Sequence, residues 1–141
     1  SKKRLKSVGR NTGITITGTS GSWYKISIKI SGKKKTGYIK KSYVTIIRKP
    51  TLSIASVSKS KIKLKWNKIS GASGYEIQRY NSSKKKYTTV KTISKGSTTS
   101  YTNGSLKKNT TYKYRIRSYK KVKGKKIYSY YCSAKRGKTT K

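Results

Sequence analysis

Apolar and cationic residues alternate strictly along Lys61-Ile62-Lys63-Leu64-Lys65-Trp66, and this pattern indicates the fold class of the chain. Two further stretches, Ser27-Ile28-Lys29-Ile30 and Tyr112-Lys113-Tyr114-Arg115-Ile116-Arg117, show the same alternation. A period of two is typical of strands that have one buried face and one solvent-facing face. The apolar residues are mainly Ile, Val, Tyr and Trp, which suit strands, and no segment shows a helical period. We therefore predict an all-β protein.

The charge of the chain is extreme and one-sided. Lysine and arginine make up 39 of the 141 residues, against one acid, Glu76, and no histidine, so that the formal net charge is +38. A small soluble domain normally carries a net charge of about 2–8 in magnitude. Self-repulsion at this level opposes compaction and attracts polyanions. We therefore expect an anionic polymer as the partner, either a teichoic-acid-like wall polymer or a nucleic acid.

The missing acids and histidines exclude most catalytic chemistry within this chain. One carboxylate cannot form the acid–base pair of a hydrolase, and without histidine neither a Ser-His-Asp nor a Cys-His site can be assembled. One cysteine and one glutamate cannot complete a metal coordination shell. A lysine nucleophile is conceivable in principle, but nothing singles out one lysine among so many solvated ones. We expect no catalytic residues, no metal site and no cofactor, and we interpret the protein as a non-enzyme.

Cys132 is the one cysteine, so no disulfide bond can form within the chain. An intermolecular bridge or a reactive thiol is one interpretation. We favour a small buried side chain in a strand, because cysteine is among the most buried residue types. No apolar stretch approaches the ~20 residues of a membrane span. Since the chain begins without an initiator methionine or a signal peptide, we expect a mature or excised piece of a longer protein.

The only proline, Pro50, predicts the boundary between two modules. Proline lacks a backbone donor and holds the preceding residue extended, so it belongs at a strand edge or a junction. Short Gly- and Ser-rich stretches recur along the chain at the spacing of turns in a sandwich or barrel. We predict a first module at residues 1–47, a second at residues 50–137, and a basic tail at residues 138–141.

Four short motifs follow one another in the first module: Gly13-Ile14-Thr15-Ile16-Thr17-Gly18, Gly21-Ser22-Trp23-Tyr24-Lys25-Ile26, Thr36-Gly37-Tyr38-Ile39 and Ser42-Tyr43-Val44. In this order they resemble the bacterial SH3 (SH3b) family, and the resemblance covers about residues 4–46. The resemblance implies a partial SH3-like barrel, because the first strand of the family is absent ahead of these motifs. An unpaired edge invites strand addition, so we expect another protein chain, or a copy of this one, to supply the missing strand.

The second module contains a series of motifs: Lys61–Trp66, Gly71-Ala72-Ser73-Gly74-Tyr75-Glu76-Ile77, Thr98-Thr99-Ser100-Tyr101-Thr102 and Leu106-Lys107-Lys108-Asn109-Thr110-Thr111-Tyr112, with later strands ending at Tyr119 and beginning at Ile127. This series resembles the fibronectin type III family, which implies an immunoglobulin-like β-sandwich. The resemblance also implies a secreted protein of clostridia-like Gram-positive bacteria, located at the cell wall or cell surface. The tyrosine-corner spacing of the family implies that Tyr112 makes a corner hydrogen bond, and its B strand implies that Trp66 packs in the core; we prefer these roles to ligand stacking.

Runs of lysine are the candidate polyanion-binding residues, and we expect all of them in turns. A charge run is ordinarily a solvated surface, but that interpretation leaves the absence of acids unexplained, so we favour contact with a polyanion. The outward faces of the second module add Lys61, Lys63, Lys65, Lys113, Arg115 and Arg117. The candidate residues are Lys33, Lys34, Lys35, Lys40, Lys41, Lys84, Lys85, Lys86, Lys107, Lys108, Lys120, Lys121, Lys123, Lys125 and Lys126.

Four aromatic residues of the first module, Trp23, Tyr24, Tyr38 and Tyr43, either build its core or line a surface groove; large aromatics are mostly buried, which favours the core.

The leading hypothesis is a non-catalytic, extracellular module that associates with the cell wall or cell surface. Two alternatives stay open: a sequence-independent nucleic-acid-coating protein, and a structural subunit of an extracellular assembly with an anionic partner.

Overall fold

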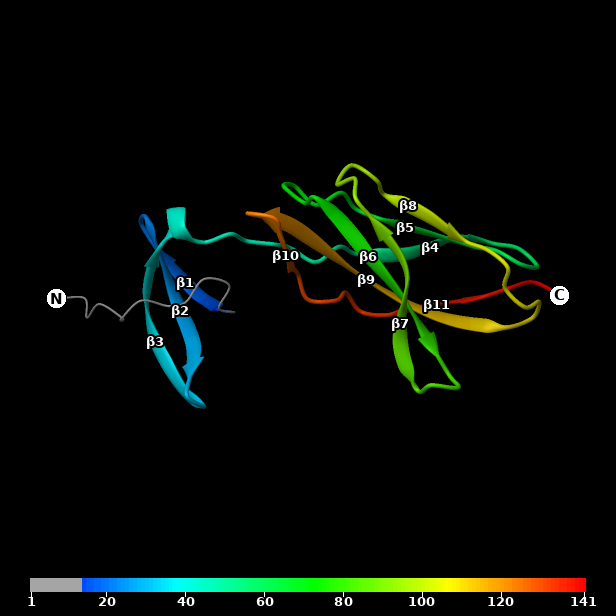
Figure 1. Cartoon of the computed structure of the whole chain (residues 1–141), viewed down its shortest axis with the longest axis horizontal. Helices are drawn as coiled ribbons and strands as arrows, with labels where there is room; N and C mark the ends of the chain where they lie inside the picture. The colour runs from blue at the N-terminus through cyan, green and yellow to red at the C-terminus, as the bar shows by residue number, and fades with distance from the viewer. Residues whose placement is uncertain (1–13) are drawn as a thin grey trace. The chain divides into compact units, whose positions relative to one another are not determined.

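The computed structural model describes residues 14–141 and divides the chain into two compact units, Ser1–Ile46 and Ile47–Lys141. Figure 1 labels the strands of both units along the chain. Within the described residues the secondary structure consists of β-strands and one short 3-10 turn. Residues 14–141 contain no helix that is long and apolar enough to cross a membrane. The all-β prediction is confirmed for residues 14–141.

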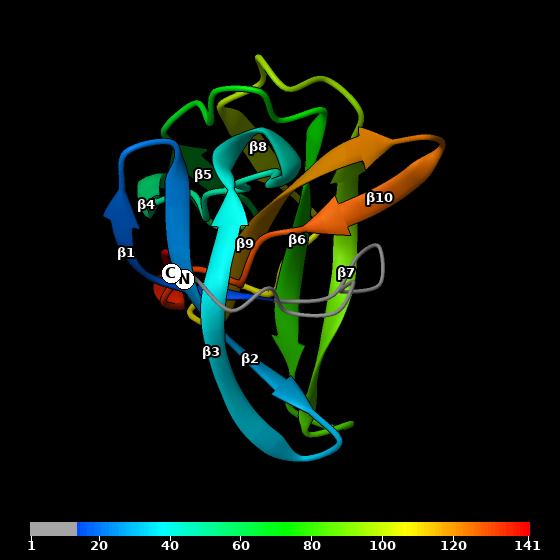
Figure 2. The same cartoon turned by 90° about the vertical axis from the view of Figure 1, so that its left-hand side faces the viewer.

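Unit 1 contains an antiparallel sheet of three consecutive strands in the order β1-β2-β3. Figure 2 shows the three strands side by side. Ser31 and Gly32, at φ +48° and +75°, reverse the chain between the second and third strand, as a tight two-residue hairpin requires. Ile26 and Ile28 are buried in this unit. The elements are β1 (Thr15–Ser20), β2 (Trp23–Ile30), β3 (Lys33–Lys40) and the 3-10 turn η1 (Lys41–Tyr43).

The partial SH3-like barrel stays a prediction: residues 14–46 form an antiparallel sheet of three strands, which does not by itself establish a barrel. The predicted absence of the family's first strand falls on residues ahead of Ile14, which lie outside the described residues. Completion of this sheet by another chain is likewise untested and stays a prediction.

Unit 2 is a sandwich of two antiparallel sheets that pack face to face over one core. The first sheet has the order β4-β5-β8, and the second has the order β10-β9-β6-β7, with β11 also paired to β9. The alternating stretches at Lys61 and at Tyr112 become β5 and β9, as predicted. The strands of unit 2 are β4 (Leu52–Val57), β5 (Ile62–Trp66), β6 (Gly74–Asn81), β7 (Lys86–Ile93), β8 (Ser100–Asn103), β9 (Thr111–Val122), β10 (Lys125–Tyr128) and β11 (Lys135–Lys138).

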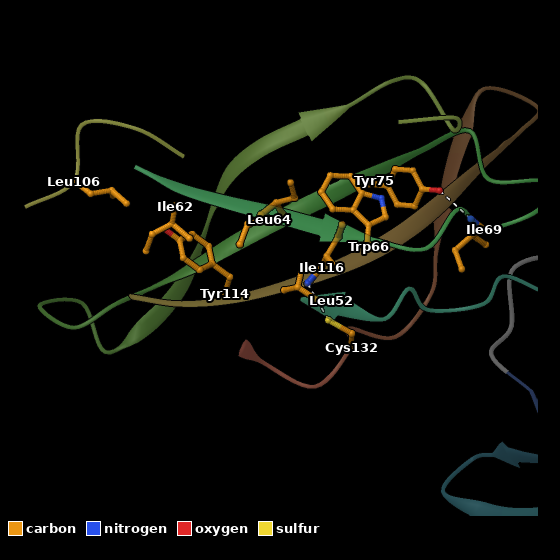
Figure 3. Close-up of a cluster of buried hydrophobic side chains, with 11 residues drawn as sticks. Leu52, Ile62, Leu64, Trp66, Ile69, Tyr75, Leu106, Tyr114, Ile116 and Cys132 are labelled. Carbon is orange, nitrogen blue, oxygen red and sulfur yellow. Dashed lines mark hydrogen bonds between the residues drawn. The ribbon is translucent and has the colours of Figure 1, made fainter. Parts of the chain in front are cut away.

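The core of the sandwich is built from the apolar residues of the alternating strands, drawn in Figure 3. Trp66 is only 3% exposed, and its ring centroid lies 5.4 Å from that of Tyr75. Ile62 and Leu64 are fully buried on the same side of β5. The predicted core position of Trp66 is therefore confirmed, and the lysines between these residues are on the outer face of the sheet.

The predicted corner hydrogen bond of Tyr112 is confirmed. The backbone N–H of Lys107 donates to the Tyr112 hydroxyl over 2.9 Å. This bond closes the loop from residue 106 to the start of β9 and holds the backbone that carries Lys107 and Lys108.

Cys132 is buried, as predicted, but the predicted strand is wrong. It lies between β10 and β11, where the backbone leaves the strand pattern at residues 129–134. The Ile116 N–H donates to the Cys132 sulfur over 3.4 Å. The Cys132 side chain therefore accepts a hydrogen bond that a backbone carbonyl would accept in a regular sheet. Burial raises the pKa of the Cys132 thiol, which disfavours the thiolate and therefore a reactive role.

The predicted basic tail at residues 138–141 is also wrong. Lys138 ends β11, and Thr139 is 2% exposed. The Thr139 hydroxyl donates to the Lys107 carbonyl over 2.6 Å, and the Thr140 N–H donates to the Ser58 carbonyl over 3.1 Å. These bonds make residues 138–140 part of the sandwich.

Candidate polyanion-binding surface

The predicted lysines of unit 2 lie at both ends of the sandwich. The register of β6 with β9 pairs Arg79 with Tyr114 and Gly74 with Tyr119. The turn at residues 82–85 and the loop at residues 106–110 therefore lie at one end, and the β9–β10 hairpin lies at the other. The first end carries Lys84, Lys85, Lys86, Lys107 and Lys108, and the second carries Lys120, Lys121, Lys123, Lys125 and Lys126.

The expectation that every lysine run sits in a turn is wrong. Both lysine-rich hairpins reverse direction over two residues, so their strands continue through the charges. In the β9–β10 hairpin the turn is Lys123-Gly124, at φ +49° and +78°. The lysines found in strands are Lys33, Lys34, Lys35 and Lys40 in β3, Lys86 in β7, Lys120 and Lys121 in β9, and Lys125 and Lys126 in β10, while Lys41 lies in η1.

Strand pairing places lysines directly opposite lysines. In the β2–β3 hairpin Lys29 faces Lys34, and in the β9–β10 hairpin Lys126 faces Lys121. Like charges at directly opposed positions destabilise a sheet. The chain's single acid is engaged elsewhere, so no carboxylate of this chain relieves the repulsion. We call these two segments the lysine hairpins; a bound polyanion would remove the repulsion that each contains.

The arginines of β9, which we expected as open cationic contacts, are covered by tyrosine rings. The Arg115 guanidinium lies 3.9 Å from the ring centroids of both Tyr87 and Tyr131. The Arg117 guanidinium lies 3.7 Å from the ring centroid of Tyr128 and 4.6 Å from that of Tyr131. We call these five residues the aromatic–arginine ladder. Planar guanidinium groups stack on aromatic faces, so the ladder joins β7, β9, the end of β10 and the segment after β10.

Glu76, the single acid, completes the ladder. Its carboxylate pairs with the Arg117 guanidinium at 3.0 Å and accepts a hydrogen bond from the Tyr131 hydroxyl. Burial, followed by the hydrogen bond to Glu76, raises the pKa of Tyr131. The one negative charge of the chain therefore serves the structure of the sheet, and Arg115 and Arg117 are less available to a polyanion than the lysines are.

Sequence reasoning missed the ladder. Its members are brought together from β7, β9 and residues 128–131, and no spacing along the chain predicts those contacts. One feature of the sequence could have indicated these contacts: positions 115 and 117 are arginine in a chain whose cations are mostly lysine.

The four candidate groove aromatics of unit 1 do not share one face of the sheet. Trp23 pairs with Lys40, which puts it on the same face as Tyr38, whereas Tyr24 pairs with Ile39 on the opposite face. The Lys40 ammonium lies 5.7 Å from the Trp23 ring centroid. Tyr43, in η1, is 77% exposed, so the core role that we favoured is wrong for this residue. A single groove lined by all four aromatics is therefore inconsistent with the strand register.

The fold and the register of unit 2 define an immunoglobulin-like β-sandwich. Residues 48–131 match the fibronectin type III domain family, more than half of the chain, and the chain belongs to this family. Domains of this family are generally non-catalytic binding or structural modules. A comparison with curated proteins returned no match.

Solved structures agree with this family assignment. FN3tt is 19% identical, with a TM-score of 0.55, and the match covers 69% of this chain and 98% of that one. The fibronectin type III domain of human fibronectin type III domain containing protein 3 is 17% identical over 69% of this chain and 89% of that one, with a TM-score of 0.55. A two-domain segment of chicken tenascin is 18% identical over 83% of this chain and 63% of that one, with a TM-score of 0.57. At these identities the likeness establishes the fold alone.

Proposed function

We propose that this protein is a non-catalytic, extracellular module that associates with the cell wall or cell surface by binding an anionic polymer. The observation that carries the proposal is the direct opposition of lysines in the lysine hairpins, Lys29 with Lys34 and Lys121 with Lys126, in a chain with one acid. Such pairs are unfavourable alone and become favourable around a bound anion.

The partner we propose is a phosphate polymer of the teichoic-acid type. The lysines of unit 2 lie at both ends of the sandwich and along its faces, which suits a long flexible chain better than a compact ligand. The arginines of β9, the residues best suited to paired contacts with base edges, are stacked in the ladder. The SH3b-like unit would act as a second contact with the wall or with a protein partner.

Binding to purified wall sacculi tests this function. We expect the protein to sediment with intact sacculi and to lose most of that binding after the teichoic acids are removed, with duplex DNA as a competitor in parallel. Equal binding to stripped sacculi would contradict the proposal. Strong preference for the DNA competitor would instead favour a nucleic-acid-coating protein.

Neutralising the β9–β10 lysine hairpin should weaken binding while leaving the fold intact. We expect the joint change of Lys120, Lys121, Lys123, Lys125 and Lys126 to glutamine to lower the affinity for the wall polymer about 10- to 100-fold, because exposed ion pairs contribute about 0.2–1 kcal/mol each. The measurement is a binding titration, with the thermal midpoint as the check on folding.

The matched control removes five exposed lysines of unit 2 that lie outside the lysine hairpins. It should lose clearly less affinity, because its lysines are not paired directly with one another. Equal losses in both variants would show that charge number, and not the hairpin, determines binding. The control lysines are Lys59, Lys68, Lys91, Lys95 and Lys135.

A further inference from the structure

The outer face of the sheet β4-β5-β8 carries lysines and hydroxyls in register across all three strands. Lys65 is paired with Ser53 on one side and Ser100 on the other. All three residues are exposed, and the Ser53 hydroxyl donates to the Lys65 carbonyl over 3.2 Å.

A second row of the same kind lies two residues along the strand. Lys63 is paired with Ser56 and Thr102, and these three residues are also exposed. Ile62, Leu64 and Trp66 project from the same strand into the core (Figure 3), so the lysines point outward. Each lysine therefore has a hydroxyl residue on both sides, and we call these six residues the lysine–hydroxyl face.

The spacing of the two rows matches the repeat of an extended phosphodiester chain. Residues two apart on a strand are about 7 Å apart. A peptide residue contributes three backbone bonds and spans at most about 3.3–3.6 Å, so a phosphodiester repeat of six backbone bonds spans about 7 Å. Successive phosphates could then meet Lys65 and Lys63 in turn, each with a hydroxyl donor within the same row.

The chemistry of the face distinguishes between phosphodiester polymers. A single-stranded nucleic acid has a similar backbone repeat, but proteins that bind it supply aromatic rings on which its bases stack. The six residues of this face are lysine, serine and threonine, and the aromatic neighbour Tyr101 pairs with the inward-facing Leu64. The face suits a backbone of phosphates and polyol units that carries no bases.

We infer that the lysine–hydroxyl face is a binding site for an extended polyol phosphate chain, with Lys63 and Lys65 on successive phosphates. The hydroxyls of Ser56, Ser100 and Thr102 act as the hydrogen-bond donors, because the Ser53 hydroxyl already donates to the Lys65 carbonyl. This inference rests on the proposed function and names both the site and the class of polymer. Such a site differs from a diffuse cationic surface, because binding depends on the match between the spacing of the phosphates and the spacing of the two lysines.

The test is a calorimetric titration of the full chain with soluble poly(glycerol phosphate). Lys63→Gln with Lys65→Gln should lower the affinity about tenfold. The matched control, Lys91→Gln with Lys95→Gln, removes the same charge from exposed positions of unit 2 outside the candidate lysines and should cost no more than about twofold. A charge-neutral pair, Ser100→Ala with Thr102→Ala, should cost about fivefold through lost hydrogen bonds, with thermal midpoints confirming that each variant folds.

Inorganic polyphosphate and single-stranded DNA are the comparison polymers. Polyphosphate has a repeat of only two bonds, so we expect the two lysine pairs to matter equally for it. If the two pairs of lysine substitutions lowered the affinity for poly(glycerol phosphate) equally, the inference would be overturned and the proposed function would stay intact. An equal dependence of DNA binding on Lys63 and Lys65 would overturn the restriction to base-free chains. If the unaltered protein bound none of the polymers, both the inference and the proposed function would fail.

Discussion

Replacing Trp66 with alanine should destabilise the sandwich by about 3–5 kcal/mol, the cost of truncating a buried tryptophan in a packed core. Trp66 is 3% exposed and packs against Tyr75. A domain of this kind has a total stability of about 5–15 kcal/mol, so the variant should lie close to unfolding. Urea unfolding at a fixed, moderate salt concentration measures the change.

Trp66→Phe is the matched control. The Trp66 indole N–H is buried and has no hydrogen-bond partner among the described residues, so phenylalanine removes no bond and keeps most of the packing. We expect a cost of about 1 kcal/mol. A Trp66→Ala variant that kept native stability and lost polymer binding would show that Trp66 is a ligand platform and would refute its core role.

The second large effect concerns Gly74, where β6 begins. A Cβ atom built at this position would overlap the carbonyl oxygen of Ile93 and lie 2.6 Å from the Tyr119 hydroxyl. The Tyr119 hydroxyl itself donates to the Ile93 carbonyl over 3.1 Å. Gly74→Ala must therefore move backbone and break this bond, and we expect it to destabilise the sandwich by about 3 kcal/mol.

Gly104→Ala provides the comparison for the same chemical change. Its added Cβ would meet only the Lys61 side chain at 3.9 Å, which is ordinary contact. We expect a change within about 0.5 kcal/mol for this variant. If Gly74→Ala unfolded at the same urea concentration as Gly104→Ala, that result would contradict the claim that Gly74 lies too close to Ile93 and Tyr119 to admit a Cβ atom.

Local pattern was enough to predict the strands and core of unit 2. The strict alternation around Leu64 predicts both the strand and the side of it that is buried, because side chains on a strand point alternately to opposite faces. The spacing that ends at Tyr112 predicts a hydrogen bond to a backbone only a few residues away, and the structure contains it. These features depend on neighbours in the sequence.

Features that depend on distant partners were not predictable in the same way. The lysine runs looked like turns because lysine is depleted in strands, but Ser31-Gly32 and Lys123-Gly124 reverse the chain so tightly that the runs pair with each other. The ladder contact between Arg115 and Tyr131 depends on where the chain runs after it leaves β10. The burial of Thr139 likewise follows from its bonds to Lys107 and Thr110.

The lysine–hydroxyl face could be predicted only in part from the sequence. The sequence identified Lys63 and Lys65 as outward-facing, but not the residues beside them. Ser100 and Thr102 come from a strand more than thirty residues away, and a bulge between Ile54 and Ser56 sets which serine of β4 faces Lys63. The register of the sheet, and not the composition of one strand, makes this face a candidate site.

If the lysines of this protein bind a phosphate polymer electrostatically, the affinity for that polymer must depend on the salt concentration. Each phosphate that a lysine neutralises releases condensed counterions, so the logarithm of the association constant should fall linearly with the logarithm of the salt concentration. With about six phosphates contacted on a single-stranded polymer, the affinity should fall a few hundredfold between about 50 and 200 mM salt. An affinity for poly(glycerol phosphate) that stayed constant over this range would contradict the electrostatic mechanism.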